Sequence, residues 1–137
     1  MLFRSPDGSI DLTAFDAKIH GSTLKYEESG DNLGFWTNDR DWAEWTFTVT
    51  KPGTFDVAMT FSCDGKSAGG VHQLKLVDQV LDGKVESTGG WTKFKTVSAG
   101  RFIIAEPGEW SLGVRGRKAE KAEGLMNLRA VKLTPVR

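Results

Sequence analysis

The sequence lacks an excess of charge of either sign and has no long hydrophobic run. Its 137 residues contain 18 basic and 18 acidic side chains, so the formal net charge is zero. A neutral chain has no overall field that would attract nucleic acid or an anionic membrane. No stretch approaches the roughly 18 apolar residues that a membrane-spanning helix requires. We therefore predict neither a nucleic-acid-binding nor a membrane protein.

Cysteine and histidine are also scarce. The single Cys63 cannot form an internal disulfide, and its place in an alternating apolar run predicts a buried structural thiol. The two histidines, His20 and His72, lie in no metal-ligand motif. We predict that His72 is a core or edge residue; a zinc site built from both histidines is the weaker alternative. No hydrolase elbow, phosphate loop or dinucleotide fingerprint is present, and we predict no cofactor.

Period-two alternation is the strongest pattern that is present. Apolar side chains alternate with Glu and Thr over residues 44–49, and the pattern resumes over residues 55–63. The Lys51-Pro52-Gly53 sequence between these runs is typical of a turn. Alternation on both sides of a turn predicts an antiparallel hairpin with one buried face.

The same pattern continues to the end of the chain. Further short strands are expected at 72–76, 91–97, 102–105, 110–114 and 128–134, with Gly, Pro, Asp and Asn between them. Helical periodicity is almost absent. This spacing predicts a single all-β domain over residues 1–137, an antiparallel sandwich, with residues 1–9 as a loosely ordered N-terminal segment.

The five tryptophans fall into two groups. Trp45 and Trp110 alternate in phase with the buried faces and are predicted to lie in the core, and Trp42 in the core or at its rim. Trp36 and Trp91 lie among polar turn residues, where an indole is a plausible exposed platform. We favour a platform for Trp36, and both platform and core stay open for Trp91.

Charged residues offer two weaker hypotheses. Paired carboxylates can hydrolyse glycosidic bonds, although none here lies in a distinctive motif. The candidate pairs are Glu27 with Glu28, Asp39 with Asp41, and Glu106 with Glu109. A basic group is interrupted by acids and is predicted to be a solvated loop, with an anion site as the alternative. Its members are Arg115, Arg117, Lys118 and Lys121.

Five short motifs, in order, resemble the carbohydrate-binding modules of family 6 and their relatives. The motifs are Gly34 with the following aromatics, Asp41-Trp42-Ala43-Glu44-Trp45, Lys51-Pro52-Gly53-Thr54-Phe55-Asp56-Val57, Gly89-Gly90-Trp91 and Met126-Asn127-Leu128. The resemblance spans about residues 10–133. It is greatest to the modules appended to bacterial sulfatases, fucosidases and other polysaccharide-degrading proteins.

The resemblance implies a fold and a site. The expected fold is the galactose-binding-like β-sandwich jelly roll, with a sugar site in loops at one end. An aromatic of the first loop, Phe35 or Trp36, and the loop tryptophan Trp91 would enclose a sugar ring. Asn127 would hydrogen-bond its hydroxyls. The implied partners are a poly- or oligosaccharide and a linked glycoside hydrolase or sulfatase domain.

One departure from the family concerns calcium. The resemblance implies a structural calcium held by acids of the first strand and of the closing motif. Here the closing motif reads Asn127-Leu128-Arg129, and a cationic Arg129 opposes binding of a hard cation that needs oxygen ligands. We predict that the calcium site is lost and that Arg129 pairs with Asp11 or another acid.

Three functions follow as hypotheses. The leading one is a non-catalytic carbohydrate-binding module, the second a structural or interaction domain that packs on a partner enzyme without a sugar site, and the third a small enzyme with a carboxylate pair. The first ten residues lack the apolar region of a secretory signal. This leaves a cytoplasmic protein or a piece of a longer exported chain; the resemblance favours the latter, in an extracellular or periplasmic location.

Overall fold

The computed structural model describes residues 7–137, which form eleven strands and one short 3-10 helix. The elements are β1 (Ile10–Thr13), η1 (Ala14–Asp16), β2 (Lys18–His20), β3 (Lys25–Glu27), β4 (Asn32–Gly34), β5 (Trp42–Val49), β6 (Gly53–Cys63), β7 (Val71–Leu76), β8 (Gln79–Lys84), β9 (Gly90–Ile104), β10 (Gly108–Arg117) and β11 (Asn127–Pro135). None of the helical residues among those described form a segment long and apolar enough to cross a membrane.

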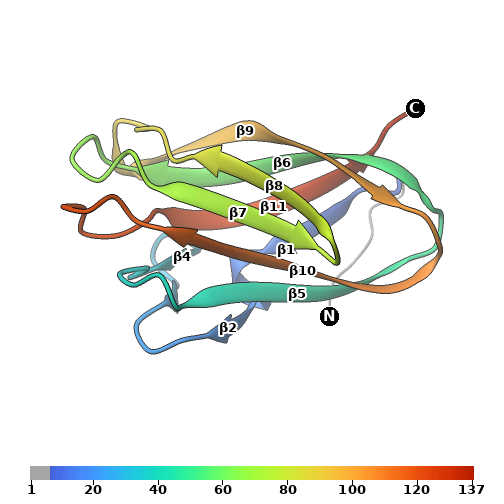
Figure 1. The fold of residues 1–137 in the computed structure, drawn as a ribbon, viewed down its shortest axis with the longest axis horizontal. Coiled ribbons are helices and arrows are strands. Elements are labelled where there is room, and N and C mark those ends of the chain that lie inside the picture. Colours follow the sequence, from blue (N-terminus) through green and yellow to red (C-terminus); the bar gives the residue numbers. More distant parts are fainter. Residues whose placement is uncertain (1–6) are drawn as a thin grey trace.

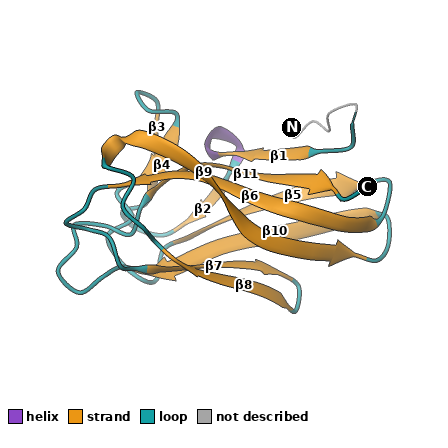
Figure 2. Cartoon of the chain, turned by 90° about the horizontal axis from the view of Figure 1, so that it is seen from above, coloured by secondary structure: helices purple, strands orange, loops and turns teal. Residues whose placement is uncertain are grey.

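The strands form two antiparallel sheets that face each other (Figures 1 and 2). The six-stranded sheet has the order β3-β4-β11-β6-β9, with β1 also paired to β11. The five-stranded sheet has the order β2-β5-β10-β7-β8. Most neighbouring strands in a sheet are far apart in sequence, as in a jelly roll; the exceptions are the sequential pairs β3–β4 and β7–β8. The predicted all-β sandwich is therefore confirmed.

The core lies between the sheets and follows from the alternation. Strand β5 buries every second side chain from Ala43 to Val49, and β6 does the same from Phe55 to Cys63. Burying one such aliphatic or aromatic side chain stabilises the fold by about 1.5–3 kcal/mol. Trp45 is 1% exposed and donates its indole N–H to the Thr13 carbonyl at 2.7 Å, which confirms it as core. The Cys63 thiol is buried, as predicted, and burial raises its pKa to about 11.

The other predicted core tryptophans lie nearer the surface. Trp110 is half-buried against the core and donates its indole N–H to the Glu106 carbonyl at 3.1 Å. Trp42 points to the outer face of the five-stranded sheet, where its ring stacks on His20 at 4.2 Å between centroids. The prediction of a core or edge His72 is confirmed, because this residue is 6% exposed.

The predicted hairpin across Lys51-Pro52-Gly53 is wrong. Strand β5 pairs with β2 and β10, whereas β6 pairs with β11 and β9. The turn therefore crosses from one sheet to the other. Alternation reports which face of a strand is buried, and in a sandwich the strands of both sheets bury one face in the same core. It does not report the partner strand.

The two ends of the sandwich differ. Five connections, residues 21–24, 35–41, 64–70, 85–89 and 118–126, gather at one end, on the left of Figure 1. The β5–β6 and β9–β10 turns lie at the other end with the C-terminus and the start of β1. Of the predicted loose segment 1–9, residues 1–6 lie outside the described residues. Ser9 is buried and donates from its amide and hydroxyl to the Asp7 carboxylate.

Candidate functional site

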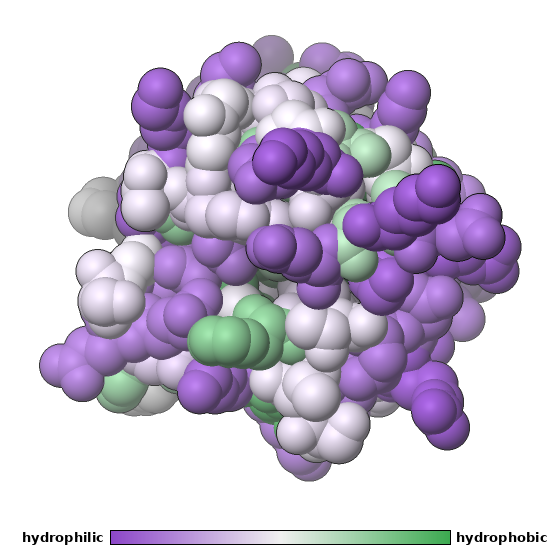
Figure 3. All heavy atoms as spheres, turned by 90° about the vertical axis from the view of Figure 1, so that its left-hand side faces the viewer, coloured by the Kyte–Doolittle hydropathy of each residue, from purple (hydrophilic) through white to green (hydrophobic). Residues whose placement is uncertain are grey.

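A hollow of about 350 Å³ lies at the loop end of the sandwich. Figure 3 views this end, which is mostly hydrophilic with small hydrophobic areas near its centre. The hollow is lined by Glu27, Phe35, Trp36, Thr37, Trp91, Glu123, Gly124, Met126 and Asn127. All four predicted site residues are among them, although they come from β9, β11 and the β4–β5 loop. Their roles in binding stay predictions.

Phe35 and Trp36 differ sharply in exposure. The side chain of Trp36 is 1% exposed, and its indole N–H donates to the Asp41 carbonyl at 3.0 Å. The prediction of Trp36 as an exposed platform is therefore wrong. The physical reason is that a buried indole needs a hydrogen-bond acceptor, and the loop backbone supplies one. Trp36 lines the hollow although it is buried, and its carbonyl accepts from the Leu125 amide at 2.8 Å.

Phe35 is the exposed aromatic of this loop. Its side chain is 52% exposed, and its backbone has φ of 56°, in the left-handed region that non-glycine residues seldom adopt. The Lys25 ammonium lies 4.5 Å from the ring centroid, a cation–π contact. Backbone strain of about 1–3 kcal/mol persists only where the surroundings fix it, and it is common in ligand-binding loops.

Asp41 fixes the loop that carries Phe35. Its carboxylate is buried and accepts hydrogen bonds from the amides of residues 22, 23 and 24 and from the Thr23 hydroxyl, at 2.9–3.1 Å. Burial alone would raise the pKa of Asp41, but these donors outweigh it and lower the pKa to about 2. Gly21 leaves room for this carboxylate, because a Cβ there would lie 2.2 Å from the Asp41 Cγ. Asp41 thereby joins two of the loops at this end.

Trp91 is half-buried at the start of β9, with part of the side chain packed on the core. The sequence left two interpretations of Trp91 open, an exposed platform and a core residue, and the half-buried side chain lies between them. The Trp91 carbonyl accepts from the Ser62 hydroxyl at 2.6 Å and from Asn127 Nδ2 at 3.3 Å. These bonds hold Trp91 beside Asn127 at the wall of the hollow.

Glu27 is the polar group that the sequence did not assign to this site. Its carboxylate accepts from Asn32 Nδ2 at 3.0 Å and lies over Gly34, where a Cβ would come within 1.8 Å of Oε1. Asn127 Oδ1 lies 3.2 Å from the same point. The sequence paired Glu27 with Glu28, but the structure places Glu27 with Asn127 and Glu123. No local pattern signals this, because Asn127 reaches Glu27 through the pairing of β11 with β4, nearly a hundred residues apart in the sequence.

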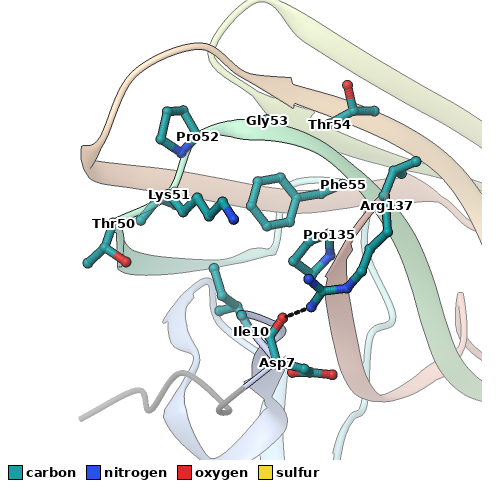
Figure 4. A pocket seen from close by; sticks show the side chains of 13 residues that line it. Asp7, Ile10, Thr50, Lys51, Pro52, Gly53, Thr54, Phe55, Pro135 and Arg137 are labelled. Atoms are coloured by element: carbon teal, nitrogen blue, oxygen red, sulfur yellow. Dashed lines mark hydrogen bonds between the residues drawn. The ribbon is translucent and has the colours of Figure 1, made fainter.

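Two further hollows lie elsewhere. One of about 450 Å³, on the outer face of the five-stranded sheet, contains Trp42, whose ring already contacts His20 and the Arg115 guanidinium. The other, about 600 Å³, lies at the opposite end of the sandwich, where Arg137 donates to the Asp7 carbonyl (Figure 4). Its only aromatic, Phe55, is 2% exposed and presents no ring face to a ligand.

Arg129 does not pair with Asp11, so that prediction is wrong. Its guanidinium donates to the Gly30 carbonyl at 2.7 Å and lies 3.6 Å from the Phe94 ring centroid. A backbone carbonyl and an aromatic face satisfy the cation without a carboxylate. Within residues 7–137 no group of three or more His, Cys, Asp or Glu residues is placed to hold a metal ion. Loss of the calcium site stays a prediction.

The comparisons with known proteins identify the fold. No protein-family model and no curated protein matches the sequence. Among solved structures, the C-terminal family 6 carbohydrate-binding module of the laminarinase LamC from Zobellia galactanivorans has a TM-score of 0.71 at 19% identity, covering 92% of this chain and 98% of that one. A module of lichenase 5A from Cellvibrio mixtus, in complex with cellotriose, has a TM-score of 0.68 at 16% identity over 93% and 97%.

The same fold also occurs outside these modules. The mosquito-larvicidal Cry4Aa toxin from Bacillus thuringiensis has a TM-score of 0.73 at 10% identity. The match covers 94% of this chain and 24% of the toxin. The fold is therefore that of the carbohydrate-binding modules, but at these identities the fold by itself does not assign a ligand. The ligand has to be inferred from the residues that line the loop-end hollow.

Proposed function

We propose that this chain is a non-catalytic carbohydrate-binding module that holds a glycan in the hollow at its loop end. The observation that carries the proposal is the convergence of Phe35, Trp91, Glu27 and Asn127 on one hollow. It is supported by the likeness to modules of polysaccharide-degrading enzymes, one of them in complex with cellotriose.

The chemistry of these side chains suits a sugar. A pyranose presents faces of C–H groups, which stack on aromatic rings such as Phe35 and Trp91. Its hydroxyls donate to a carboxylate and exchange hydrogen bonds with an amide, the groups that Glu27 and Asn127 supply. With Trp36 buried, Phe35 takes the role of the first-loop aromatic.

The benefit of such a module comes from linkage. Binding by one small hollow is weak, but a linked enzyme is held near its polymer at a high effective concentration. We propose a glycoside hydrolase or sulfatase domain as the linked partner, within an exported protein.

Removal of each aromatic tests the site. We expect Trp91→Ala and Phe35→Ala to weaken retention in polysaccharide affinity gels at least about tenfold, a typical loss for an aromatic anchor. Trp42→Ala is the matched control, because Trp42 is a half-buried tryptophan in a different hollow. It should bind as the unaltered chain does, and circular dichroism should show that all variants fold.

The outcomes separate the candidate functions. Loss of binding in Trp42→Ala with normal binding in Trp91→Ala would move the site to the outer sheet face. If no glycan on a broad array is bound, the chain is a structural or interaction domain instead. Release of reducing sugar from a bound polymer would revive catalysis by Glu27 and Glu123, which line the same hollow.

A further inference from the structure

A second hollow at the loop end is lined by three cations. It measures about 560 Å³ and is formed by Asn38, Asp39, Arg40, Arg117, Lys118 and Glu120. It lies beside the proposed glycan site along two shared loops. Thr37 of the glycan site precedes Asn38 in one loop, and Glu123 follows Glu120 by three residues in the other. We call Arg40, Arg117 and Lys118 the basic rim.

The side chains of the basic rim are not used by the fold. Within residues 7–137 the ion pairs are His20–Glu44 and Arg101–Asp56, and neither involves the rim. Asp39, although it lines the hollow, accepts from the backbone amide of Lys118 at 3.1 Å and so ties the two loops together. The rim cations therefore remain free to meet an anion from outside.

The neighbouring glycan site has the opposite net charge. In the rim hollow the three cations outnumber the two acids, Asp39 and Glu120, by one. Glu27 and Glu123 line the glycan site, and no Lys or Arg is among its lining residues. A sulfate or carboxylate group on a bound glycan is repelled from that hollow and attracted to the rim. Arginine binds such groups with two parallel N–H donors, and Arg40 and Arg117 approach the hollow from different segments of the chain.

We infer that the basic rim is an anion subsite, which selects glycans that carry a sulfate ester or a uronic carboxylate next to the unit held by Phe35 and Trp91. This inference rests on the proposed function. Arg117 and Lys118 belong to the basic group that the sequence predicted to be a solvated loop. The inference assigns these two residues to a ligand instead, and adds Arg40, which lies far from them in the sequence.

Polymers that share a backbone and differ in charge test the subsite. The pairs are dextran with dextran sulfate, desulfated κ-carrageenan with κ-carrageenan, and hydroxyethyl cellulose with carboxymethyl cellulose; comparison across pairs distinguishes sulfate from carboxylate. We expect at least one charged polymer to bind about three- to tenfold more tightly than its neutral partner in 50 mM NaCl, the gain expected from a few exposed ion pairs. The preference should disappear in 1 M NaCl, where the Debye length is about 3 Å.

Matched charge variants complete the test. Arg40→Gln/Arg117→Gln should remove the preference and leave neutral binding unchanged. Lys51→Gln/Lys132→Gln changes the net charge equally with exposed residues outside the loop end, and should keep the preference. A preference that survives in the rim variant, or equal binding of every charged and neutral partner, overturns the anion subsite while the proposed function stands. Failure of every polymer to bind overturns both.

A probe without any sugar gives an independent reading. Titration of the ¹⁵N-labelled protein with sodium sulfate and with sodium glucuronate should shift the Arg40 and Arg117 Nε–H signals in a saturable way. The Arg101 signal should move little, because that side chain is paired with Asp56 at 2.8 Å. Shifts that are linear in concentration, or equal at Arg101, would contradict the subsite.

Discussion

At the level of single residues, the proposed contact of the Glu27 carboxylate with sugar hydroxyls can be tested directly. An ionised carboxylate accepts two sugar hydroxyls, and hydrogen bonds to charged groups contribute about 1.5–3 kcal/mol each. We therefore expect Glu27→Gln to lower glycan affinity by about tenfold or more in calorimetric titration. Glu28→Gln changes the charge equally at the adjacent exposed position and should bind normally. Equal losses in both variants would point to a general charge effect and against the assigned contact.

His72 makes the stability of the domain depend on pH. Burial lowers its pKa from the ordinary value of 6.5, which the nearby Asp82 charge partly offsets, and Nδ1 has no hydrogen-bond partner among the described residues. Below pH 6.5 the unfolded chain therefore takes up a proton at this position before the folded chain does. The free energy of unfolding should fall with pH from 6.5 down to the lowered folded pKa, by at most about 1.4 kcal/mol per pH unit.

Urea titrations from pH 7 to 5 measure this effect. His72→Leu removes the group and should make the pH dependence shallower than in the unaltered protein. His20→Gln removes the partly exposed histidine and serves as the control. A pH dependence that is unchanged in His72→Leu would show that other groups cause it.

The site residues could be predicted only in part, because the sequence identifies residue types better than whether a given side chain is buried or faces solvent. Phe35, Trp91 and Asn127 came from the resemblance, and the structure places all three at one hollow. The direction of Trp36 depends on an acceptor five residues further along, the Asp41 carbonyl, which no local pattern specifies. Glu27 was missed because it meets Asn127 only through the long-range pairing of β11 with β4.

At the level of elements, the sequence predicts strands better than their partners. The alternation over 44–49 and 55–63 identified β5 and β6 and their buried faces. The register Trp110↔Phe47 shows that the partner of β5 begins about sixty residues later. Pairing over such separations is decided by how the two sheets close on a common core, and a turn of three residues carries no information on that choice.

Asp41 gives a prediction for a whole loop. Asp41→Asn keeps the size of the side chain but removes the charge that accepts three amides and a hydroxyl. We expect a loss of about 2 kcal/mol in the free energy of unfolding, in line with the lowered pKa. Glycan affinity should fall as well, because the loop that carries Phe35 loses its anchor.

Denaturation and binding measurements on the same samples test this coupling. Asp78→Asn, in an exposed turn between β7 and β8, should change neither quantity. If Asp41→Asn lowers stability but leaves affinity intact, the loop holds its shape without this anchor. The direction of this pH dependence is the same as for His72, because both groups have a lowered pKa in the folded chain, but it occurs at lower pH. The stabilisation by Asp41 is present above about pH 4 and is lost as pH falls toward 2.

At the level of the whole molecule, the proposed glycan site and the C-terminus lie at opposite ends of the sandwich (Figure 2). A domain attached after residue 137 therefore leaves the glycan site open. We expect a fluorescent protein fused there to leave glycan affinity within about twofold of that of the unaltered chain.

The same fluorescent protein inserted after the exposed Lys121, in a loop that borders both loop-end hollows, should block access to the site. Glycan affinity should then fall at least tenfold, about 1.4 kcal/mol. A variant with the insertion between Lys51 and Pro52, at the far end, controls for any general effect of inserting a domain on the fold, and should bind normally. A fusion after residue 137 that blocks binding as strongly as the Lys121 insertion would contradict a site confined to the loop end.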